Sequence, residues 1–156
     1  MQISSNDFET KSSEELIQWT IDQYGLKAGL ACSFGMEDMV LIDIIAKLKG
    51  PITIFTLDTG RLHEETYEIM EKVRSHYGLE IKTYFPNLEQ VENLVQKKGF
   101  FSFRESIENR KECCAIRKIE PLNRALGELD AWVTGLRRDQ AITRTNTPKV
   151  LEDTDH

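Results

Sequence analysis

Apolar and polar residues follow one another in blocks that predict strands and helices in alternation. Short, nearly continuous apolar runs predict buried strands at residues 29–34, 52–57 and 130–135, and an alternating run predicts a strand nearer the sheet edge at 79–85. Longer segments bounded by capping residues, glycine or proline predict helices at 13–24, 36–49, 62–77 and 88–98. This order implies right-handed crossovers and an α/β fold built on a doubly wound parallel sheet.

Pro121 interrupts the last helical segment. A single helix from Glu112 to Leu126 would hold this proline in its interior, where the missing N–H group and the ring disfavour regular geometry. The sequence therefore predicts two short helices, the second starting near Pro121.

Composition narrows the class of protein. The chain has 156 residues, 40% hydrophobic and 29% charged, and we expect one globular domain over residues 1–156. The net charge of −6 argues against a general nucleic-acid-binding surface, and no apolar run approaches the about 20 residues of a membrane span. Three cysteines, and no recognisable secretory signal, predict a protein of the reducing cytoplasm.

Cys113 and Cys114 are adjacent and have three cationic neighbours, Lys111, Arg117 and Lys118. A disulfide between two consecutive residues would strain the peptide between them. Two neighbouring thiolates suit a polynuclear iron–sulfur cluster, and two reduced thiols buried as small apolar residues are the alternative. The pair alone leaves both interpretations open.

Three of the predicted strands end in glycine or small polar residues. In a doubly wound sheet, ligands bind outside the carboxyl ends of the strands. The segments 33–35, 57–60 and 135–138 therefore predict one shared ligand-binding rim.

The first of these segments joins a strand to a helix. Ser33 offers a hydroxyl, Gly35 allows close backbone approach, and the helix start offers N–H groups, which together predict an anion cradle. It is not a Walker motif, because no Gly-Lys-Ser/Thr follows. Glu37 and Asp38 complement the helix dipole but would compete with a bound phosphate. We therefore expect one of them to point away from the phosphate or to help place a ribose.

The other two segments differ in how strongly they indicate a ligand-binding site. Residues 58–60 alone would be an ordinary strand-to-helix turn. Arg137 and Arg138 follow a strand directly, and Arg144 lies within eight residues of Arg137. Guanidinium groups capture phosphate or sulfate oxygens in pairs, so in a net-negative chain this cluster favours an anionic substrate over a solvated charge run.

Four segments occur in a characteristic order: Ser33–Asp38, Leu57–His63, Cys113–Arg124 and Thr134–Gln140. Together they resemble the assimilatory sulfonucleotide reductases, and among these the iron–sulfur adenylylsulfate (APS) reductases. The resemblance runs from about Trp19 to the last residues. It implies the adenine-nucleotide α-hydrolase-like (PP-loop) fold, and reduction of APS to sulfite and AMP in sulfate assimilation with thioredoxin or glutaredoxin as the electron donor.

The resemblance also implies roles for single residues. The Ser33–Asp38 loop would face the phosphosulfate, and Cys113 and Cys114 match two ligands of a [4Fe–4S] cluster. Lys118 matches a lysine between cluster and substrate. The remaining implied contacts are to adenine and ribose (Leu57, Asp58 and Gly60) and, in the basic segment, to the anionic groups (Gly135, Arg137, Arg138 and Arg144). The cluster cysteines favour APS over its 3′-phosphorylated form (PAPS), although some cluster-bearing members accept both.

The chain departs from the family pattern in its thiols. The family takes two further cluster ligands from a Cys-x-x-Cys and its nucleophile from a Glu-Cys-Gly-Leu-His segment, and neither motif occurs up to His156. Two thiolates cannot complete a four-iron site, and no thiol remains to attack the sulfonate sulfur. The 156 residues therefore resemble the N-terminal two-thirds of such an enzyme. We expect weak nucleotide binding, no stable intact cluster, no reductase activity from this polypeptide alone, and self-association through uncovered apolar surface.

Two other functions compete with this interpretation. An ATP-using PP-loop enzyme that adenylates its substrate would usually carry Ser-Gly-Gly-x-Asp-Ser, which the loop at Ser33 lacks. A non-catalytic module that senses AMP or APS would bind nucleotide tightly without redox chemistry.

Overall fold

A four-stranded parallel sheet lies at the centre of the computed structural model, which describes residues 5–154. Its strands are β1 (Ala28–Ala31), β2 (Thr53–Leu57), β3 (Ile81–Tyr84) and β4 (Ala131–Thr134), in the order β3-β2-β1-β4. β1 pairs in parallel with β2 on one side and with β4 on the other. The prediction that the 79–85 segment lies at an edge is confirmed, because β3 pairs only with β2.

Three helices cover one face of the sheet: α1 (Ser13–Tyr24), α2 (Met36–Leu48) and α3 (Glu64–Tyr77). Their apolar side chains, among them Ile17, Ile42 and Val73, pack with Leu30 of β1 and Ile54 of β2 in the larger core cluster. Successive strand residues point to opposite faces, so Phe55 of β2 belongs to a second cluster on the other face.

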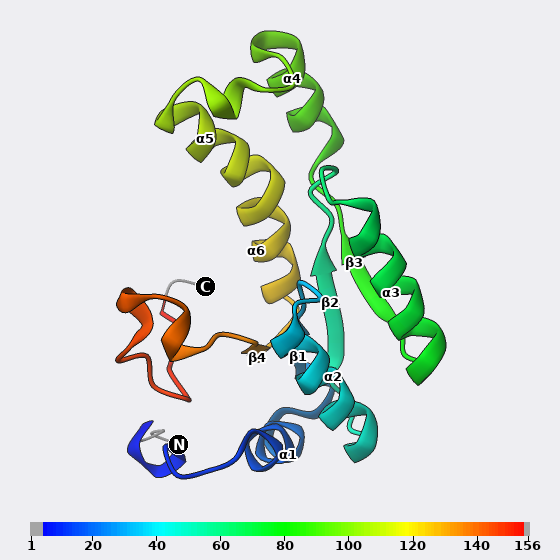
Figure 1. Cartoon of the computed structure of the whole chain (residues 1–156), viewed down its shortest axis with the longest axis vertical. Coiled ribbons are helices and arrows are strands. Elements are labelled where there is room, and N and C mark those ends of the chain that lie inside the picture. Colours follow the sequence, from blue (N-terminus) through cyan, green and yellow to red (C-terminus); the bar gives the residue numbers. More distant parts are fainter. Residues whose placement is uncertain (1–4, 155–156) are drawn as a thin grey trace.

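That second face is covered by α6 (Glu120–Leu126), whose Ala125 and Leu126 pack against Phe55 and Tyr84. Helices on both faces make the sheet doubly wound, and the predicted fold class is confirmed. In Figure 1 the strands run between α3 on one side and the long helix that ends in α6 on the other.

The segment before α6 differs from its prediction. α4 (Leu88–Lys98) leads through a short 3₁₀ turn, η3 (Ser102–Arg104), to α5 (Ile107–Cys114), which continues through a π-helical segment, η4 (Ala115–Ile119), into α6. The expected break at Pro121 is therefore wrong, and Figure 1 shows one continuous helix. The Glu120 N–H donates to Ala115 O, five residues back, and this widened turn accommodates a proline that has no N–H to donate.

Short 3₁₀ turns make up the rest of the regular structure: η1 (Ser5–Phe8), η2 (Gly25–Lys27), η5 (Arg138–Gln140) and η6 (Ile142–Arg144). The two ends of the described chain meet, because Glu9 accepts from the Arg138 guanidinium at 2.6 Å and from the Lys149 N–H at 3.0 Å.

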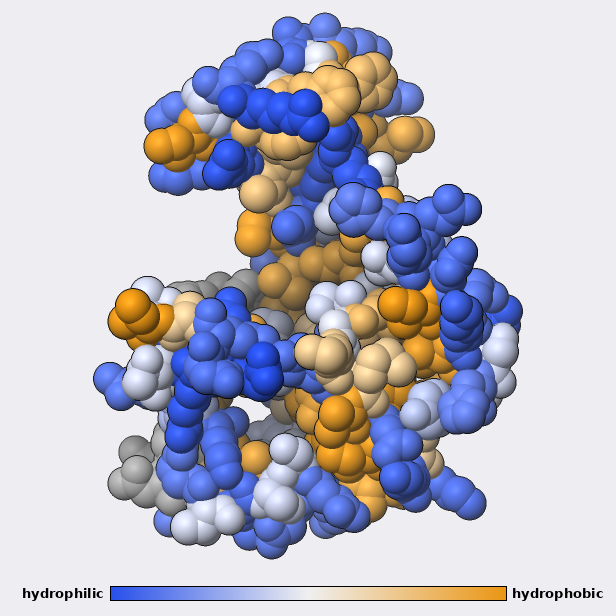
Figure 2. All heavy atoms as spheres, viewed as in Figure 1, coloured by the Kyte–Doolittle hydropathy of each residue, from blue (hydrophilic) through white to orange (hydrophobic). Residues whose placement is uncertain are grey.

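Across residues 5–154, none of the helices is both long and apolar enough to cross a membrane. Apolar side chains still reach the surface, and Figure 2 shows them beside the middle of the sheet and at the connection between α4 and α5, at the top of the view.

Candidate nucleotide site

The sheet has its topological switch point between β1 and β4. The chain leaves β1 toward α2 on one face, and it enters β4 from α6 on the other face. A pocket of about 260 Å³ opens at the carboxyl ends of these two strands, where parallel sheets bind their ligands. The pocket-lining residues come from the segments that follow β1 and β4: Ala31, Ser33, Glu37, Asp38, Thr134, Gly135, Leu136, Gln140 and Arg144.

The loop between β1 and α2 is held by Asp38. Its Oδ2 accepts from the Ser33 N–H at 2.6 Å and from the Ser33 hydroxyl at 2.8 Å, and the carboxylate is buried. Phe34, also buried, takes a φ of 63°, a left-handed conformation that is rare for a bulky residue and is often found at functional sites. Of the two carboxylates expected to compete with a phosphate, Asp38 is thus engaged within the loop.

Glu37 faces the opposite wall of the pocket. Its Oε1 lies 2.9 Å from Arg137 Nε and accepts from Gln140 Nε2 at 3.2 Å. Gln140 in turn accepts from Arg144 Nη1 at 2.7 Å. A chain of polar contacts therefore links the start of α2 to the basic segment after β4, in which Arg137 has Glu37 as an acidic partner.

Gly135 sits where these two walls approach each other. A Cβ atom at this position would overlap Asp38 Oδ1 and lie 3.1 Å from Glu37 Cβ. The close approach of β4 to α2 thus depends on a glycine here.

Arg138 is turned away from this pocket. Its guanidinium donates to Glu9 Oε2 at 2.6 Å and to the carbonyl of Thr147 at 2.8 Å. The Arg138 side chain holds the pKa of the Glu9 carboxyl below its usual value, together with the backbone N–H of Lys149. The predicted role of Arg138 in substrate binding has no support from this placement and stays a prediction.

The loop after β2 is rigidly bonded. Asp58 is buried, and its Oδ1 accepts from the Gly60 N–H at 2.7 Å and from the Tyr67 hydroxyl at 3.1 Å. Desolvation and the bond to Asp58 raise the pKa of Tyr67. β2 and β1 are adjacent and parallel, so Leu57 at the end of β2, Asp58 and Gly60 lie on the same rim as the Ser33 loop. They do not line the switch-point pocket itself.

Cys113 and Cys114 end α5 as free, half-buried thiols, and Lys118 follows on η4 with its side chain exposed. Between them and α6, Arg117 is buried and donates from Nη1 to the carbonyl of Thr59 at 2.7 Å, while its Nε has no partner among the described residues. This places the thiol-bearing helix against the loop after β2.

Cys32 differs from the other two cysteines. It is buried at the end of β1, and burial is the main reason that its pKa is raised to about 12. Among residues 5–154, no three side chains of His, Cys, Asp or Glu come together in a way that could hold a metal ion. The thiols present therefore do not fit a four-iron cluster by themselves, because such a cluster takes four ligands.

Sequence reasoning missed two polar residues at this rim. Gln140 bridges Glu37 and Arg144, and a glutamine within the basic segment was a signal that could have been used. Arg117 stands in the segment that carried the resemblance, but burial of an arginine with no acidic partner cannot be inferred from spacing.

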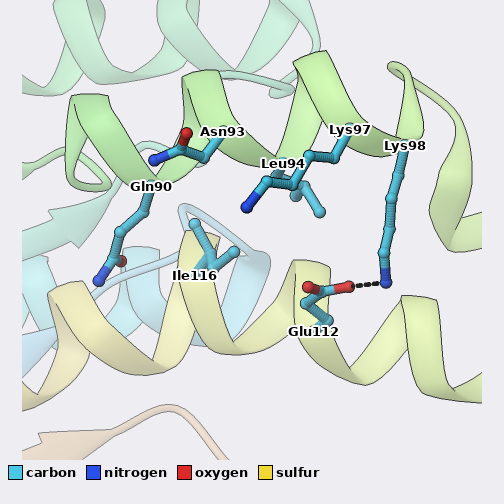
Figure 3. A pocket seen from close by; sticks show the side chains of 7 residues that line it. All are labelled: Gln90, Asn93, Leu94, Lys97, Lys98, Glu112 and Ile116. Atoms are coloured by element: carbon cyan, nitrogen blue, oxygen red, sulfur yellow. Dashed lines mark hydrogen bonds and ion pairs between the residues drawn. The ribbon is translucent and has the colours of Figure 1, made fainter.

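A second hollow of about 260 Å³ lies between α4 and the α5–η4 helix, and none of its lining residues is a predicted site residue, although Glu112 and Ile116 flank the two cysteines in the sequence. Figure 3 shows Leu94 of α4 and Ile116 of the facing helix pointing into this hollow. The Lys98–Glu112 ion pair, at 2.6 Å, joins the two helices at one end.

The parallel sheet, with helices on both faces and a pocket at its switch point, is consistent with an α/β protein of the PP-loop-like fold class. The phosphoadenosine phosphosulfate reductase domain matches residues 27–156, and the chain belongs to this family.

The chain is similar both to proteins named as APS reductases and to one named as a PAPS reductase. An adenosine 5'-phosphosulfate reductase of Burkholderia cepacia is 46% identical over 127 residues, which cover 81% of this chain and 51% of that protein. One of Pseudomonas aeruginosa (strain LESB58) is 43% identical over 142 residues, covering 91% of this chain and 52% of that protein. The crystal structure of a phosphoadenylyl-sulfate (PAPS) reductase from Candida auris, in its phosphate complex, superposes with a TM-score of 0.75 at 25% identity and covers 90% of this chain and 72% of that one. The chain spans about half the length of the curated relatives it matches.

Proposed function

We propose that the chain binds adenylylsulfate at the switch-point pocket and belongs to the machinery that reduces it to sulfite and AMP in sulfate assimilation, with electrons from thioredoxin or glutaredoxin. The observation that carries this proposal is the meeting of Arg144, the Arg137–Glu37 pair and the Ser33 loop at one pocket of a chain in this family. The relatives named above as adenosine 5'-phosphosulfate reductases favour APS, and PAPS is the second candidate substrate.

The pocket residues bind the substrate by exchanging charge partners. A phosphosulfate offers pairs of anionic oxygens on its tetrahedral phosphorus and sulfur, and such a pair suits bidentate contact with a guanidinium. Arg137 can turn from Glu37 to the ligand, and Arg144 can donate to the ligand in place of Gln140. The positive end of the α2 dipole adds to this attraction. Asp38 keeps the loop in place through Ser33 while these exchanges occur.

We also propose that Cys113 and Cys114 supply two of the four thiolate ligands of a [4Fe–4S] cluster, whose chemistry when bound would be electron transfer or electrostatic support of the reaction. The other two ligands have to come from outside these two positions, since Cys32 is buried with a high pKa. In this proposal Cys113 and Cys114 serve as cluster ligands and Cys32 is buried, so none of the three attacks the sulfonate sulfur, and we expect this polypeptide alone to be inactive.

Calorimetry with APS, PAPS, AMP and adenosine tests the binding part of this proposal. We expect measurable binding of APS and AMP, loss of more than about tenfold in affinity in Arg144→Ala, and no binding of adenosine. Single-turnover release of sulfite from labelled APS with excess thioredoxin tests the second part. Sulfite production by this polypeptide alone would contradict the predicted inactivity, and equal binding of adenosine and APS would contradict the site.

A further inference from the structure

We infer that Arg61 is a positioning residue, which fixes the helix carrying Cys113 and Cys114 to the loop that follows β2. The inference rests on the proposed function, in which the two thiols serve the reaction, and on the expectation from the resemblance that Leu57, Asp58 and Gly60 of this loop contact adenine and ribose. It makes the loop at residues 58–61 a mechanical link between the nucleotide and the thiols.

The contacts of Arg61 reach across to the connection between α4 and α5. Its Nη1 donates to the carbonyl of Phe100 at 3.0 Å, and its Cζ lies 5.3 Å and 4.9 Å from the ring centres of Phe101 and Phe103. On the other side, the Arg61 N–H donates to the Thr59 hydroxyl at 3.2 Å. One side chain therefore joins two segments that are 39 residues apart.

The contacts of Arg61 matter for the α4–α5 connection because the hairpin formed by α4 and α5 buries few apolar side chains. It projects beyond the end of the sheet in Figure 1. Leu94 is the one buried residue that α4 provides, α5 provides none, and the hollow of Figure 3 lies between them. Elements with so few buried apolar contacts open at low free energy.

The path from Arg61 to the thiols is short and continuous. Phe101 precedes the η3 turn and Phe103 lies within it, and Ser106 then caps α5 by accepting the Asn109 N–H at 3.1 Å. The α5 helix transmits the position of this cap to its last residues, Cys113 and Cys114.

The same loop holds the far end of that helix. Arg117, three residues beyond Cys114, donates to the carbonyl of Thr59 at 2.7 Å. The loop thus grips the thiol-bearing helix on both sides of the cysteines, through Thr59 and Arg61. A nucleotide bound at Asp58 and Gly60 would contact this loop, and a displacement of the loop would also displace the helix that carries the thiols.

Arg104 provides a matched control. Its Cζ lies 4.4 Å and 5.5 Å from the same two rings, but it makes no hydrogen bond to the loop in the part of the chain that the structure describes. Substituting it removes an exposed cation over the same rings and leaves the link to Phe100 in place.

The test measures how fast the reduced, metal-free chain reacts with a thiol reagent such as dithionitrobenzoate. Cys32 is buried, so the fast phase reports Cys113 and Cys114. We expect Arg61→Ala to accelerate the fast phase about fivefold, the effect of losing one hydrogen bond that restrains the helix, and Arg104→Ala to change it less than about twofold. Arg61→Lys, which keeps a cationic donor, should restore at least half of the difference. Equal rates in Arg61→Ala and Arg104→Ala, with unchanged circular dichroism, would overturn the inference.

A second arm adds AMP at saturation. AMP should slow the fast phase in the unsubstituted chain but not in Arg61→Ala, while calorimetry gives the same AMP affinity for both within about threefold. If Arg61→Ala loses both AMP binding and the protection of the thiols by AMP, Arg61 contributes to AMP binding itself, and the proposed coupling between nucleotide and thiols is refuted. If the unsubstituted chain binds no AMP, the proposed function fails, and the rates without nucleotide still decide whether Arg61 positions the helix.

Discussion

Removal of the Asp38 carboxylate should loosen the pocket before it unfolds the protein. Asp38 Oδ2 accepts two hydrogen bonds from Ser33, at 2.6 Å and 2.8 Å, and these are the contacts that fix the loop between β1 and α2. A hydrogen bond to a charged acceptor contributes about 1.5 to 3 kcal/mol. Ser33 is exposed, so in Asp38→Ala water would satisfy its donors in part, and we expect a net loss of about 2 kcal/mol in the free energy of unfolding.

Asp43 supplies the comparison on the same helix. It binds Lys47 at 2.6 Å and the Tyr77 hydroxyl at 3.3 Å, and its ion pair is largely exposed. Asp43→Ala should therefore lower the free energy of unfolding by less than about 1 kcal/mol. Urea titration followed by tryptophan fluorescence gives both values. APS calorimetry should show that only Asp38→Ala weakens binding. Equal stabilities of the two variants, or unchanged APS affinity in Asp38→Ala, would refute the role given to this carboxylate.

Three further predictions concern the same rim. Gly135→Ala should lower the free energy of unfolding by about 1–3 kcal/mol in urea titration, because its Cβ would overlap Asp38 Oδ1, and an unchanged midpoint would show that β4 can shift. Glu37→Gln should tighten APS binding by about two- to fivefold in low-salt calorimetry, because an exposed pair with Arg137 is worth at most about 1 kcal/mol, and weaker binding would instead assign Glu37 to the substrate. Burial raises the pKa of Cys32 to about 12, so this thiol should resist iodoacetamide at neutral pH and gain reactivity as the pH rises toward that value. It should react freely in urea. Rapid labelling of Cys32 in the folded chain, measured by mass spectrometry, would contradict its burial.

Element boundaries were predictable where a local signal fixes them. α4 begins and ends as expected because Asn87 caps it by accepting the Gln90 N–H, and Gly99 ends it with a φ of 77°. The strand at 29–34 is shorter than predicted, because the chain turns at Phe34 into a left-handed conformation that no apolar pattern reveals. The helix through Pro121 was missed for a related reason: a π-helical turn, which contains the buried Arg117, precedes the proline, and no apolar pattern reveals such a turn.

The candidate site was predictable as a set of segments but not as a set of contacts. Adjacent arginines show why: Arg137 turns to Glu37 at the pocket, while Arg138 turns to Glu9 near the start of the described chain. The 3₁₀ turn that separates their directions depends on Gln140, which accepts the Arg137 N–H at 3.2 Å. Side-chain directions in irregular backbone are decided by such tertiary bonds, and these cannot be read from residue spacing.

The two acidic residues in this pocket are compatible with anion binding because each already has a protein partner: Ser33 for Asp38 and Arg137 for Glu37. Asp38 Oδ2 accepts both hydrogen bonds from Ser33, so this oxygen is engaged within the loop. Glu37 pairs with Arg137 at 2.9 Å, which places a negative charge beside one of the guanidinium groups of the basic segment. Under the proposed function, a neutral nucleoside would not compete for Arg137, whereas a phosphosulfate would offer Arg137 a bidentate partner and leave Glu37 bonded to Gln140. In this proposal, discrimination for the anion would follow from competition for Arg137, and it would weaken as salt screens the Arg137–Glu37 pair.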